Sequence, residues 1–266
     1  MIIGFIGTGN MGYPMLKGAV SAFGAEEVCF YDASPERRAF VKEETGASPM
    51  EDNKTLAASC RFVVLAVKPY VYPAVMEEIK EALGADTIVI TIAAGVAIQQ
   101  SKEALGAQRR IIRAMPNTPA MVKEGMTGIC YSKDEFAEEE KQLANAFFSA
   151  FGKVEVFEEK LMDAVVCANG SSPAYVYMFI EALADSVVKY GIPRDKAYVL
   201  TAQTVLGAAK MVLETGEHPG ALKDKVCTPG GTTIAGVAAL EEYGMRNAVI
   251  KATDACYEKA ASMHKK

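Results

Sequence analysis

Three glycines near the start of the chain constrain its fold more than any other feature. Gly7, Gly9 and Gly12 form a G-x-G-x-x-G pattern between a short apolar run, Ile2–Ile6, and a helix-compatible segment that extends to about Phe23. This strand–turn–helix context is typical of a dinucleotide-binding turn. In such a turn the first glycine makes a tight bend, the second lets the backbone approach a pyrophosphate, and the third lets the helix pack close to the strand. The alternative is a glycine-rich turn with a purely structural role.

The following sequence alternates between helix-like and strand-like segments. Apolar, β-branched runs at Phe62–Val67 and Thr87–Ala93 are typical of strands covered on both faces, as in parallel sheets. Other strands are predicted at Val28–Asp32 and around Ile111, Thr127 and Val154. The β-α-β-α order predicts an α/β Rossmann-type domain with a doubly wound, mostly parallel sheet. We assign residues 1–160 to this dinucleotide-binding domain.

Strand signals stop after about Glu159, and residues 161–266 are predicted to form an all-α domain for substrate binding and dimerisation. Pro173 suits the first turn of a helix. From Ala174 to Tyr190 the charged residues form one narrow stripe at a spacing of four, and the segment from about Arg194 to Glu214 is nearly as apolar. Helices this apolar must be buried, and a small helical domain can hardly cover two of them. We therefore expect a homodimer, with a tight bundle inside one subunit as the alternative.

An acidic residue, Asp32, stands at the end of the second predicted strand, 20 residues after Gly12. A carboxylate in this place accepts hydrogen bonds from the ribose hydroxyls of NAD and repels the 2′-phosphate of NADP. Ser34, Arg37 and Arg38 follow at once and would favour that phosphate, although the two arginines also suit a solvated helix start. The choice between NADPH and NADH therefore stays open.

Three further motifs follow predicted strands, at the edge where open α/β sheets bind their ligands. They are Ala66–Pro69 (AVKP), Ile92–Gly95 (IAAG) and Arg113–Gly125 (RAMPNTPAMVKEG). The last of these places Asn117 between two prolines. A stiff loop of this kind would wall a nicotinamide pocket.

The most informative run of the second half places Pro-Gly-Gly-Thr-Thr before an apolar-periodic helix, within Leu222–Glu242. Free amides at a helix start attract anions, and the hydroxyls of Thr232 and Thr233 lie beside them. The run therefore indicates an anion site. Ordinary N-capping by a threonine is the alternative.

The composition excludes several classes of protein. The net charge of −5 and the sequence pI of about 5.3 argue against nucleic-acid binding, which needs a basic face. No apolar run reaches the ~18 residues of a membrane span. Strand-like residues begin at Ile2, which leaves no room for a signal peptide. Six scattered cysteines, without a Cys/His cluster, indicate buried thiols in a reducing cytoplasm and no metal site.

Taken together, the glycine turn and the motifs AVKP, RAMPNTPA, SPAY and LKDKVCTPGGTTIAGVAALE resemble the pyrroline-5-carboxylate reductase family over nearly the whole chain. The resemblance implies an NAD(P)H-dependent oxidoreductase that acts on a C=N bond. The implied reaction reduces 1-pyrroline-5-carboxylate to L-proline, the last step of proline biosynthesis. The resemblance also implies a dimer interlocked through its helical domains, commonly with higher assembly of the dimers.

The resemblance and the arguments above together give the expected site. Cofactor contacts are expected at Ile6, Gly7, Thr8, Gly9, Asn10, Met11, Gly12, Asp32, Ser34, Asn53, Ala66, Val67, Lys68, Pro69, Ile92, Ala93, Ala94 and Asn117. Substrate contacts are expected at Ser171, Gly230, Gly231, Thr232 and Thr233, with the two threonines as the catalytic residues. Two residues depart from the family pattern. Val166 stands where the family often has a threonine, and Asp32 stands where many NADPH-preferring members have a small residue.

The implied chemistry makes modest demands on the protein. An iminium is already a good hydride acceptor, so catalysis would rest on positioning the ring and on binding the carboxylate. A proton would come from water, Ser171 or Ser172. Two alternatives stay open at this point. One is a β-hydroxyacid dehydrogenase-like oxidoreductase, in which Lys189 would serve as the base although a solvated position explains it more simply. The other is a non-catalytic, dinucleotide-binding regulatory protein.

Overall fold

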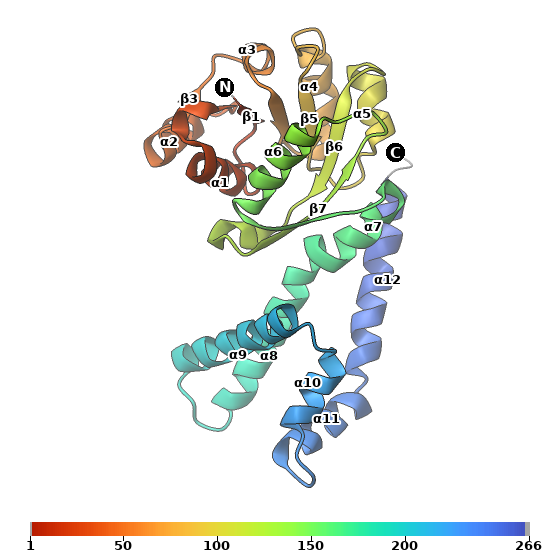
Figure 1. Cartoon of the computed structure of the whole chain (residues 1–266). Coiled ribbons are helices and arrows are strands. Elements are labelled where there is room, and N and C mark those ends of the chain that lie inside the picture. Colours follow the sequence, from red (N-terminus) through yellow and green to blue (C-terminus); the bar gives the residue numbers. More distant parts are fainter. Residues whose placement is uncertain (1, 264–266) are drawn as a thin grey trace. The chain divides into compact units, whose positions relative to one another are not determined.

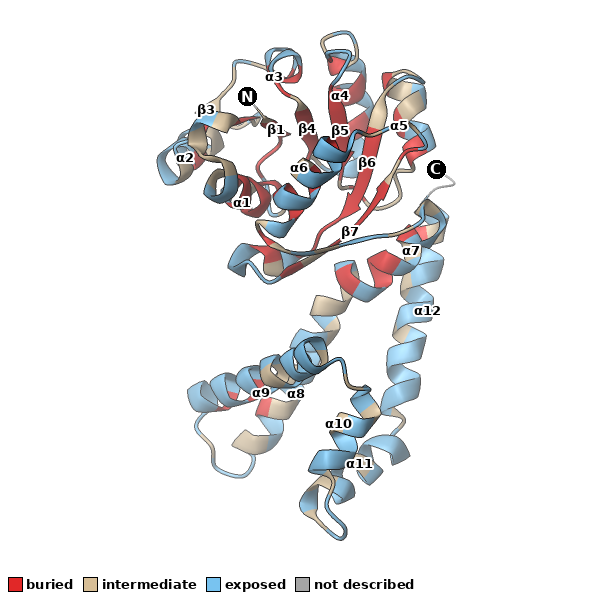
Figure 2. Ribbon diagram, in the orientation of Figure 1, coloured by how far each residue is buried: buried red, intermediate tan, exposed pale blue. Residues whose placement is uncertain are grey.

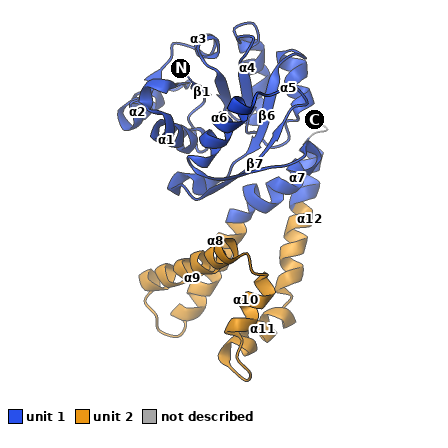
Figure 3. Ribbon diagram, viewed as in Figure 1, with its two compact units in different colours: residues 1–173, 256–266 blue, residues 174–255 orange. Residues whose placement is uncertain are grey.

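The computed structural model describes residues 2–263, which fall into two compact units (Figure 1, Figure 3). Described residues up to Pro173 and from Cys256 onward form unit 1, and Ala174–Ala255 form unit 2. This division rests on compactness alone. It does not test the functional boundary expected after residue 160, which stays a prediction.

Unit 1 is built on an eight-stranded sheet with the order β3-β2-β1-β4-β5-β6-β7-β8. All neighbouring strands are parallel except β6 and β7. The strands are β1 (Ile3–Ile6), β2 (Val28–Tyr31), β3 (Ser48–Pro49), β4 (Phe62–Leu65), β5 (Ile88–Thr91), β6 (Arg110–Met115), β7 (Gly125–Tyr131) and β8 (Gly152–Val156). The predicted doubly wound, mostly parallel sheet is therefore confirmed. Only the two-residue strand β3 was not predicted.

Helices cover both faces of this sheet because successive strand residues point to opposite sides. Phe5 and Val64 face one hydrophobic core, and Ile6 and Leu65 face the other. The first core packs against α1 (Gly12–Phe23), α2 (Pro35–Thr45) and α6 (Glu138–Ser149). The second packs against α3 (Asn53–Ser59), α4 (Tyr72–Ile79), α5 (Ile98–Leu105) and α7 (Met162–Val165). Short 3₁₀ turns occupy Ala25–Glu27, Pro69–Val71, Thr118–Val122 and Glu159–Leu161.

The strand order reverses at β1, which lies between β2 and β4. The chain first winds outward through β2 and β3 and then returns to the other side of β1. In open α/β sheets, ligands bind outside the carboxyl ends of the strands at such a switch point. The glycine turn, AVKP and IAAG directly follow β1, β4 and β5, so the sheet brings them to this one edge.

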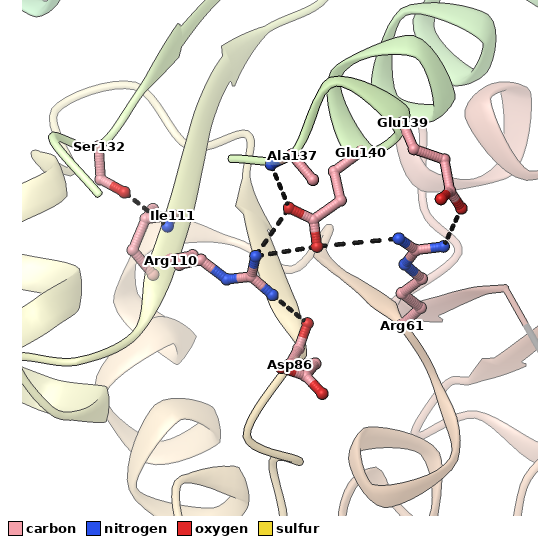
Figure 4. Close-up of polar contacts among 8 residues, drawn as sticks. All are labelled: Arg61, Asp86, Arg110, Ile111, Ser132, Ala137, Glu139 and Glu140. Carbon is pink, nitrogen blue, oxygen red and sulfur yellow. Dashed lines mark hydrogen bonds and ion pairs between the residues drawn. The ribbon is translucent and has the colours of Figure 1, made fainter. Parts of the chain in front are cut away.

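A partly buried ion-pair network lies at the opposite end of the sheet (Figure 4). Glu140 on α6 is 5% exposed, and its carboxylate accepts from Arg110 Nη1 at 2.7 and 2.8 Å and from the backbone N–H of Ala137 at 3.0 Å. Arg110 also donates to the carbonyl oxygen of Asp86 at 2.6 Å. Because both partners are paired and hydrogen-bonded, the buried charge is compensated. The network fastens the start of β6 to helix α6.

A π-helical segment, Val166–Ser171, joins α7 to α8 (Ser172–Val188). Pro173 lies in the first turn of α8, as predicted, and the π-helical segment continues the helical path upstream of it. Proline has no N–H to donate to the carbonyl four residues before it. That carbonyl, of Asn169, instead accepts from Asn117 Nδ2 at 3.1 Å. The side chain of Asn117 thus compensates for the missing backbone bond.

The remaining helices are α9 (Arg194–Thr215), α10 (Pro219–Val226), α11 (Thr232–Glu242) and α12 (Met245–Met263). Unit 2 is exposed along most of its helices (Figure 2). In α8, Tyr177 is 58% and Met178 69% exposed, and in α9 Val199 is 72% exposed. The tight bundle within one subunit is therefore wrong for this part of the chain. Within residues 2–263, none of the helices combines the length and apolar character needed to cross a membrane.

Candidate active site

The glycine turn has the geometry expected of a dinucleotide-binding turn. Gly7 has a φ of 92°, and a Cβ there would lie 2.9 Å from the carbonyl oxygen of Ala66. A Cβ at Gly12 would lie 2.3 Å from the carbonyl oxygen of Gly7, so α1 can start this close to the strand because residue 12 is glycine. At Gly9, no described atom lies within 4 Å of an added Cβ. The space over the turn is therefore open to a ligand.

Asp32 holds this turn in place. Its Oδ2 accepts from the backbone N–H of Thr8 at 2.8 Å and from the Thr8 hydroxyl at 2.9 Å, and its Oδ1 accepts from the N–H of Ser34 at 3.1 Å. Charge-assisted bonds of this kind are stronger than neutral ones. Asp32 was predicted to accept from the ribose hydroxyls and to repel a 2′-phosphate, and its bonds to Thr8 were not predicted.

Ser34 caps α2 by accepting from the backbone N–H of Arg37 at 3.0 Å. The side chain of Arg37 turns back to the glycine turn, where its Nε donates to the carbonyl oxygen of Thr8 at 2.8 Å. Its guanidinium carbon lies 4.7 Å from the ring centroid of Tyr13. Arg38 donates to the carbonyl oxygen of Asp32 at 2.5 Å. Both cations are therefore fixed beside the end of β2 rather than free in solvent.

Asn53, the first residue of α3, has an unused acceptor. Its Nδ2 donates to Glu78 Oε2 at 2.8 Å, while its buried Oδ1 has no hydrogen-bond partner among the described residues. The side chain is only 7% exposed. Buried polar atoms are usually paired, so this oxygen fits a ligand donor such as a sugar hydroxyl.

The two loops that follow β4 and β5 differ in exposure. Lys68 and Pro69 are exposed, whereas Ile92 and Ala94 are half-buried and Ala93 is buried. Gly95 has a φ of 78°, and a Cβ there would lie 2.7 Å from Cβ of Met263 on α12. The end of α12 therefore packs directly on the IAAG loop.

Asn117 is 9% exposed and is engaged within the protein. Besides its bond to Asn169, its Oδ1 accepts from the backbone N–H of Met126 at 2.8 Å. Asn169 in turn donates to the carbonyl oxygens of Met115 at 2.8 Å and Met126 at 3.0 Å. The two asparagines fasten the end of β6 to the start of β7. A direct contact between Asn117 and a cofactor stays a prediction.

The Pro-Gly-Gly-Thr-Thr run forms a turn followed by a helix. The N–H of Gly231 donates to the carbonyl oxygen of Thr228 at 3.0 Å, and Gly230 has a φ of 68°, as a type II turn with proline at its second position requires. Helix α11 starts at Thr232, and its N-cap residue is Gly231. The capping alternative is therefore wrong, because neither Thr232 nor Thr233 is the N-cap. The first amides of α11 have no side-chain cap among the described residues.

Ser171 ends the π-helical segment, and its Oγ accepts from Cys256 Sγ at 3.2 Å. Ser172 donates to the carbonyl oxygen of Ala168, and Val166 is buried. In residues 2–263, no three His, Cys, Asp or Glu side chains are grouped as a metal site would need.

Comparison with known proteins identifies the family. Residues 159–263 match the family described as pyrroline-5-carboxylate reductase dimerisation, and residues 2–95 match one described as NADP oxidoreductase, coenzyme F420-dependent. The chain is 47% identical over 265 residues to the pyrroline-5-carboxylate reductase of Escherichia coli (strain K12), with 99% of this chain and 98% of that protein covered. This chain belongs to the pyrroline-5-carboxylate reductase family.

Other members of the family support the same assignment. The pyrroline-5-carboxylate reductase of Methanosarcina acetivorans is 41% identical over 267 residues, with 99% of this chain and 98% of that protein covered. The solved structure of a pyrroline-5-carboxylate reductase from Coxiella burnetii matches with a TM-score of 0.92 and 35% identity, over 99% of this chain and 98% of that one. The pyrroline carboxylate reductase of Plasmodium falciparum, solved with NADP bound, matches with a TM-score of 0.88 and 33% identity, over the same shares.

Family membership also settles two sequence-based expectations. The chain is an NAD(P)H-dependent oxidoreductase. Its helical part is a dimerisation domain, which accounts for the exposed apolar side chains of α8 and α9. The hydroxyacid dehydrogenase alternative loses its support, because Lys189 is exposed beyond the end of α8 and lies over the ring of Tyr190.

Proposed function

We propose that this chain reduces 1-pyrroline-5-carboxylate to L-proline with NADPH or NADH. The observation that carries the proposal is the 47% identity to the Escherichia coli reductase, which extends over both the glycine turn and the Pro-Gly-Gly-Thr-Thr helix start. The open space over Gly9 and the buried free acceptor of Asn53 fit a dinucleotide at the edge of the sheet. When bound, the reduced nicotinamide supplies the hydride.

The protein's own residues have three tasks in this reaction. Amides at the start of α1, where Met11 has no capping atom, favour a pyrophosphate. Thr232 and Thr233, with the amides of the first turn of α11, favour the substrate carboxylate. Reduction places a hydride on the C=N carbon and a proton on the nitrogen. Water or the hydroxyl of Ser171 supplies the proton, and Val166 has no hydroxyl for this step.

For the cofactor, we propose a preference for NADPH over NADH. Both oxygens of Asp32 accept hydrogen bonds from Thr8 and Ser34, which weakens its repulsion of a 2′-phosphate. Arg37 and Arg38 are held beside the end of β2, where their charge favours that phosphate. Assembly of dimers into larger particles and a cytoplasmic location are also proposals. The latter is supported by the six free cysteines.

The test is a steady-state assay of the purified protein with 1-pyrroline-5-carboxylate and each reduced dinucleotide. We expect proline to form in equal amount to the oxidised cofactor, with the larger kcat/KM for NADPH. A matched assay with a β-hydroxyacid and NADP⁺ should show no turnover. Binding of dinucleotide without any turnover of the imine would instead support the regulatory alternative.

A further inference from the structure

A buried tyrosine links the two strands that carry the AVKP and IAAG loops. Tyr72, the first residue of α4, is 2% exposed and projects into the core between α4 and the sheet. Its hydroxyl donates to the carbonyl oxygen of Leu65 at 2.5 Å and accepts from the backbone N–H of Ile92 at 3.1 Å. Leu65 is the last residue of β4, and Ile92 is the first residue after β5.

These two backbone groups are the ones that would continue the β4–β5 ladder. The strands are parallel and Leu65 pairs with Thr91. In this register, alternate N–H groups of β5 donate to alternate carbonyls of β4, as Ile88 does to Arg61 at 2.9 Å. Two further steps along the ladder bring the N–H of Ile92 to the carbonyl of Leu65. In the described chain, that bond runs through the hydroxyl of Tyr72 instead.

The neighbouring ladders continue directly at the same level. The N–H of Ala66 donates to the carbonyl oxygen of Ile6 at 2.8 Å, and the N–H of Gly7 donates to that of Tyr31 at 2.8 Å. The inserted hydroxyl is therefore a local feature of the β4–β5 pair. An oxygen atom between donor and acceptor needs more room than a direct bond, so the carboxyl ends of these two strands are held apart.

We propose that Tyr72 is a positioning residue for the dinucleotide: its hydroxyl separates the carboxyl ends of β4 and β5 and so sets the distance between the AVKP and IAAG loops. The proposal rests on the proposed function, because those loops are cofactor contacts only by family membership. The hydroxyl satisfies both backbone groups, so the opened ladder leaves neither of them unpaired. A phenol is protonated at neutral pH, and burial raises the pKa of Tyr72 further, so its hydroxyl is available as a donor.

The test is Tyr72→Phe, which removes the hydroxyl and keeps the ring in the core. Without the inserted oxygen, the N–H of Ile92 and the carbonyl of Leu65 can bond directly and draw the two loops together. We expect the kcat/KM for NADPH to fall about ten- to a hundredfold, the scale of a small misplacement of reacting groups. The Kd for NADP⁺ should rise in a direct titration, and the KM for the imine should stay unchanged.

The chain offers a matched control at the other end of the same two strands. The hydroxyl of Thr87, just before β5, donates to the carbonyl oxygen of Cys60, just before β4, at 3.1 Å, and Thr87 is 5% exposed. Thr87→Val also removes one buried hydroxyl bond, but away from the ligand edge. The melting temperature of Thr87→Val should fall as that of Tyr72→Phe does. Its Kd for NADP⁺ should equal that of the wild type.

Two results would overturn the positioning role. One is a Tyr72→Phe protein with the wild-type Kd for NADP⁺ and a lowered melting temperature. The other is an equal loss of NADP⁺ affinity in Thr87→Val. A crystal structure of Tyr72→Phe adds an independent measurement, since the distance from Ile92 N to the oxygen of Leu65 should be that of a direct bond. Failure of the wild type to bind NADP⁺ would instead defeat the proposed function.

Discussion

Asp32 receives two hydrogen bonds from Thr8, one from its backbone N–H and one from its hydroxyl. The second residue of the glycine turn is thereby tied to the end of the neighbouring strand. The carboxylate therefore stabilises the conformation of the glycine turn, a role that does not depend on which dinucleotide is bound.

We predict that Asp32→Ala weakens the binding of NADPH and NADH alike. A hydrogen bond to a charged group contributes about 1.5–3 kcal/mol. Without these bonds the glycine turn is less well fixed for its ligand, so both Kd values should rise by about tenfold or more. Asp32→Asn, which keeps an acceptor oxygen, should lose less. Fluorescence titration with both reduced dinucleotides measures the effect. A rise in NADPH affinity with a fall in NADH affinity would show that the carboxylate contacts the ribose instead.

For the helix start in unit 2, we predict that Thr233→Ala lowers the kcat/KM for the imine substrate without lowering stability. Gly231, not a threonine, is the N-cap of α11, so no capping bond is lost. A hydrogen bond to a charged carboxylate contributes roughly 1.5–3 kcal/mol, which corresponds to about a ten- to hundredfold loss. Thr233→Ser should retain most activity.

The control for Thr233 is Thr215→Ala, at the end of α9, where the hydroxyl donates to the carbonyl oxygen of Met211. This variant should keep the kinetics of the wild type. A Thr233→Ala protein with a lowered melting temperature and intact kcat/KM would remove Thr233 from the site.

The dimerisation domain allows a prediction about assembly. Phe179 on α8 is 40% exposed in a single chain, and Phe179→Lys would place an unpaired charge in the dimer contact. Sedimentation velocity should show a monomer, and activity should be lost. Glu181→Lys introduces the same side chain on the polar stripe of the same helix and should remain dimeric. A dimeric Phe179→Lys protein would mean that this part of α8 lies outside the contact.

Acid stability should depend on Asp52, the N-cap of α3. Hydrogen bonds from the backbone N–H of Thr55 lower the pKa of its carboxyl below the ordinary value. A lowered pKa in the folded state adds stability that is present at neutral pH and is lost as the pH falls through that lowered value. Asp52→Asn should therefore melt earlier than the wild type at pH 7, and the two should converge in acid. A gap that is the same at every pH would contradict this account.

The sequence was sufficient to predict the strands that consist of a clear run of apolar residues. Seven of the eight strands were predicted, and the clearest signals came from β4 and β5, whose continuous apolar runs are buried on both faces of the sheet. Strand β3, Ser48–Pro49, has no such run. It exists because the end of β2 offers backbone groups, as the bond from the N–H of Met50 to the carbonyl of Phe30 shows.

Within the site, side chains that act on a distant backbone were missed. The bonds of Asp32 to Thr8 span 24 residues, and that of Asn117 to Asn169 spans 52. Tyr72 reaches Ile92 across 20 residues. No local periodicity encodes these contacts, because the partners are brought together by the strand order of the sheet and by segments that pack against it. The π-helical segment before α8 was missed for the same reason. The carbonyl of Asn169, which Pro173 cannot reach with an N–H, is satisfied by Asn117 from another part of the chain.

The exposed apolar helices of unit 2 affect both the measured stability of this protein and the effect of a variant copy in the cell. Where a second copy covers those faces, folding of the helical part depends on the concentration of chains, so the melting temperature should rise on concentrating the sample. A cell that makes two versions of the chain would form mixed pairs. A variant that still pairs but forms an inactive dimer would inactivate the intact copies bound to it. Total activity would then fall by more than the fraction of variant chains.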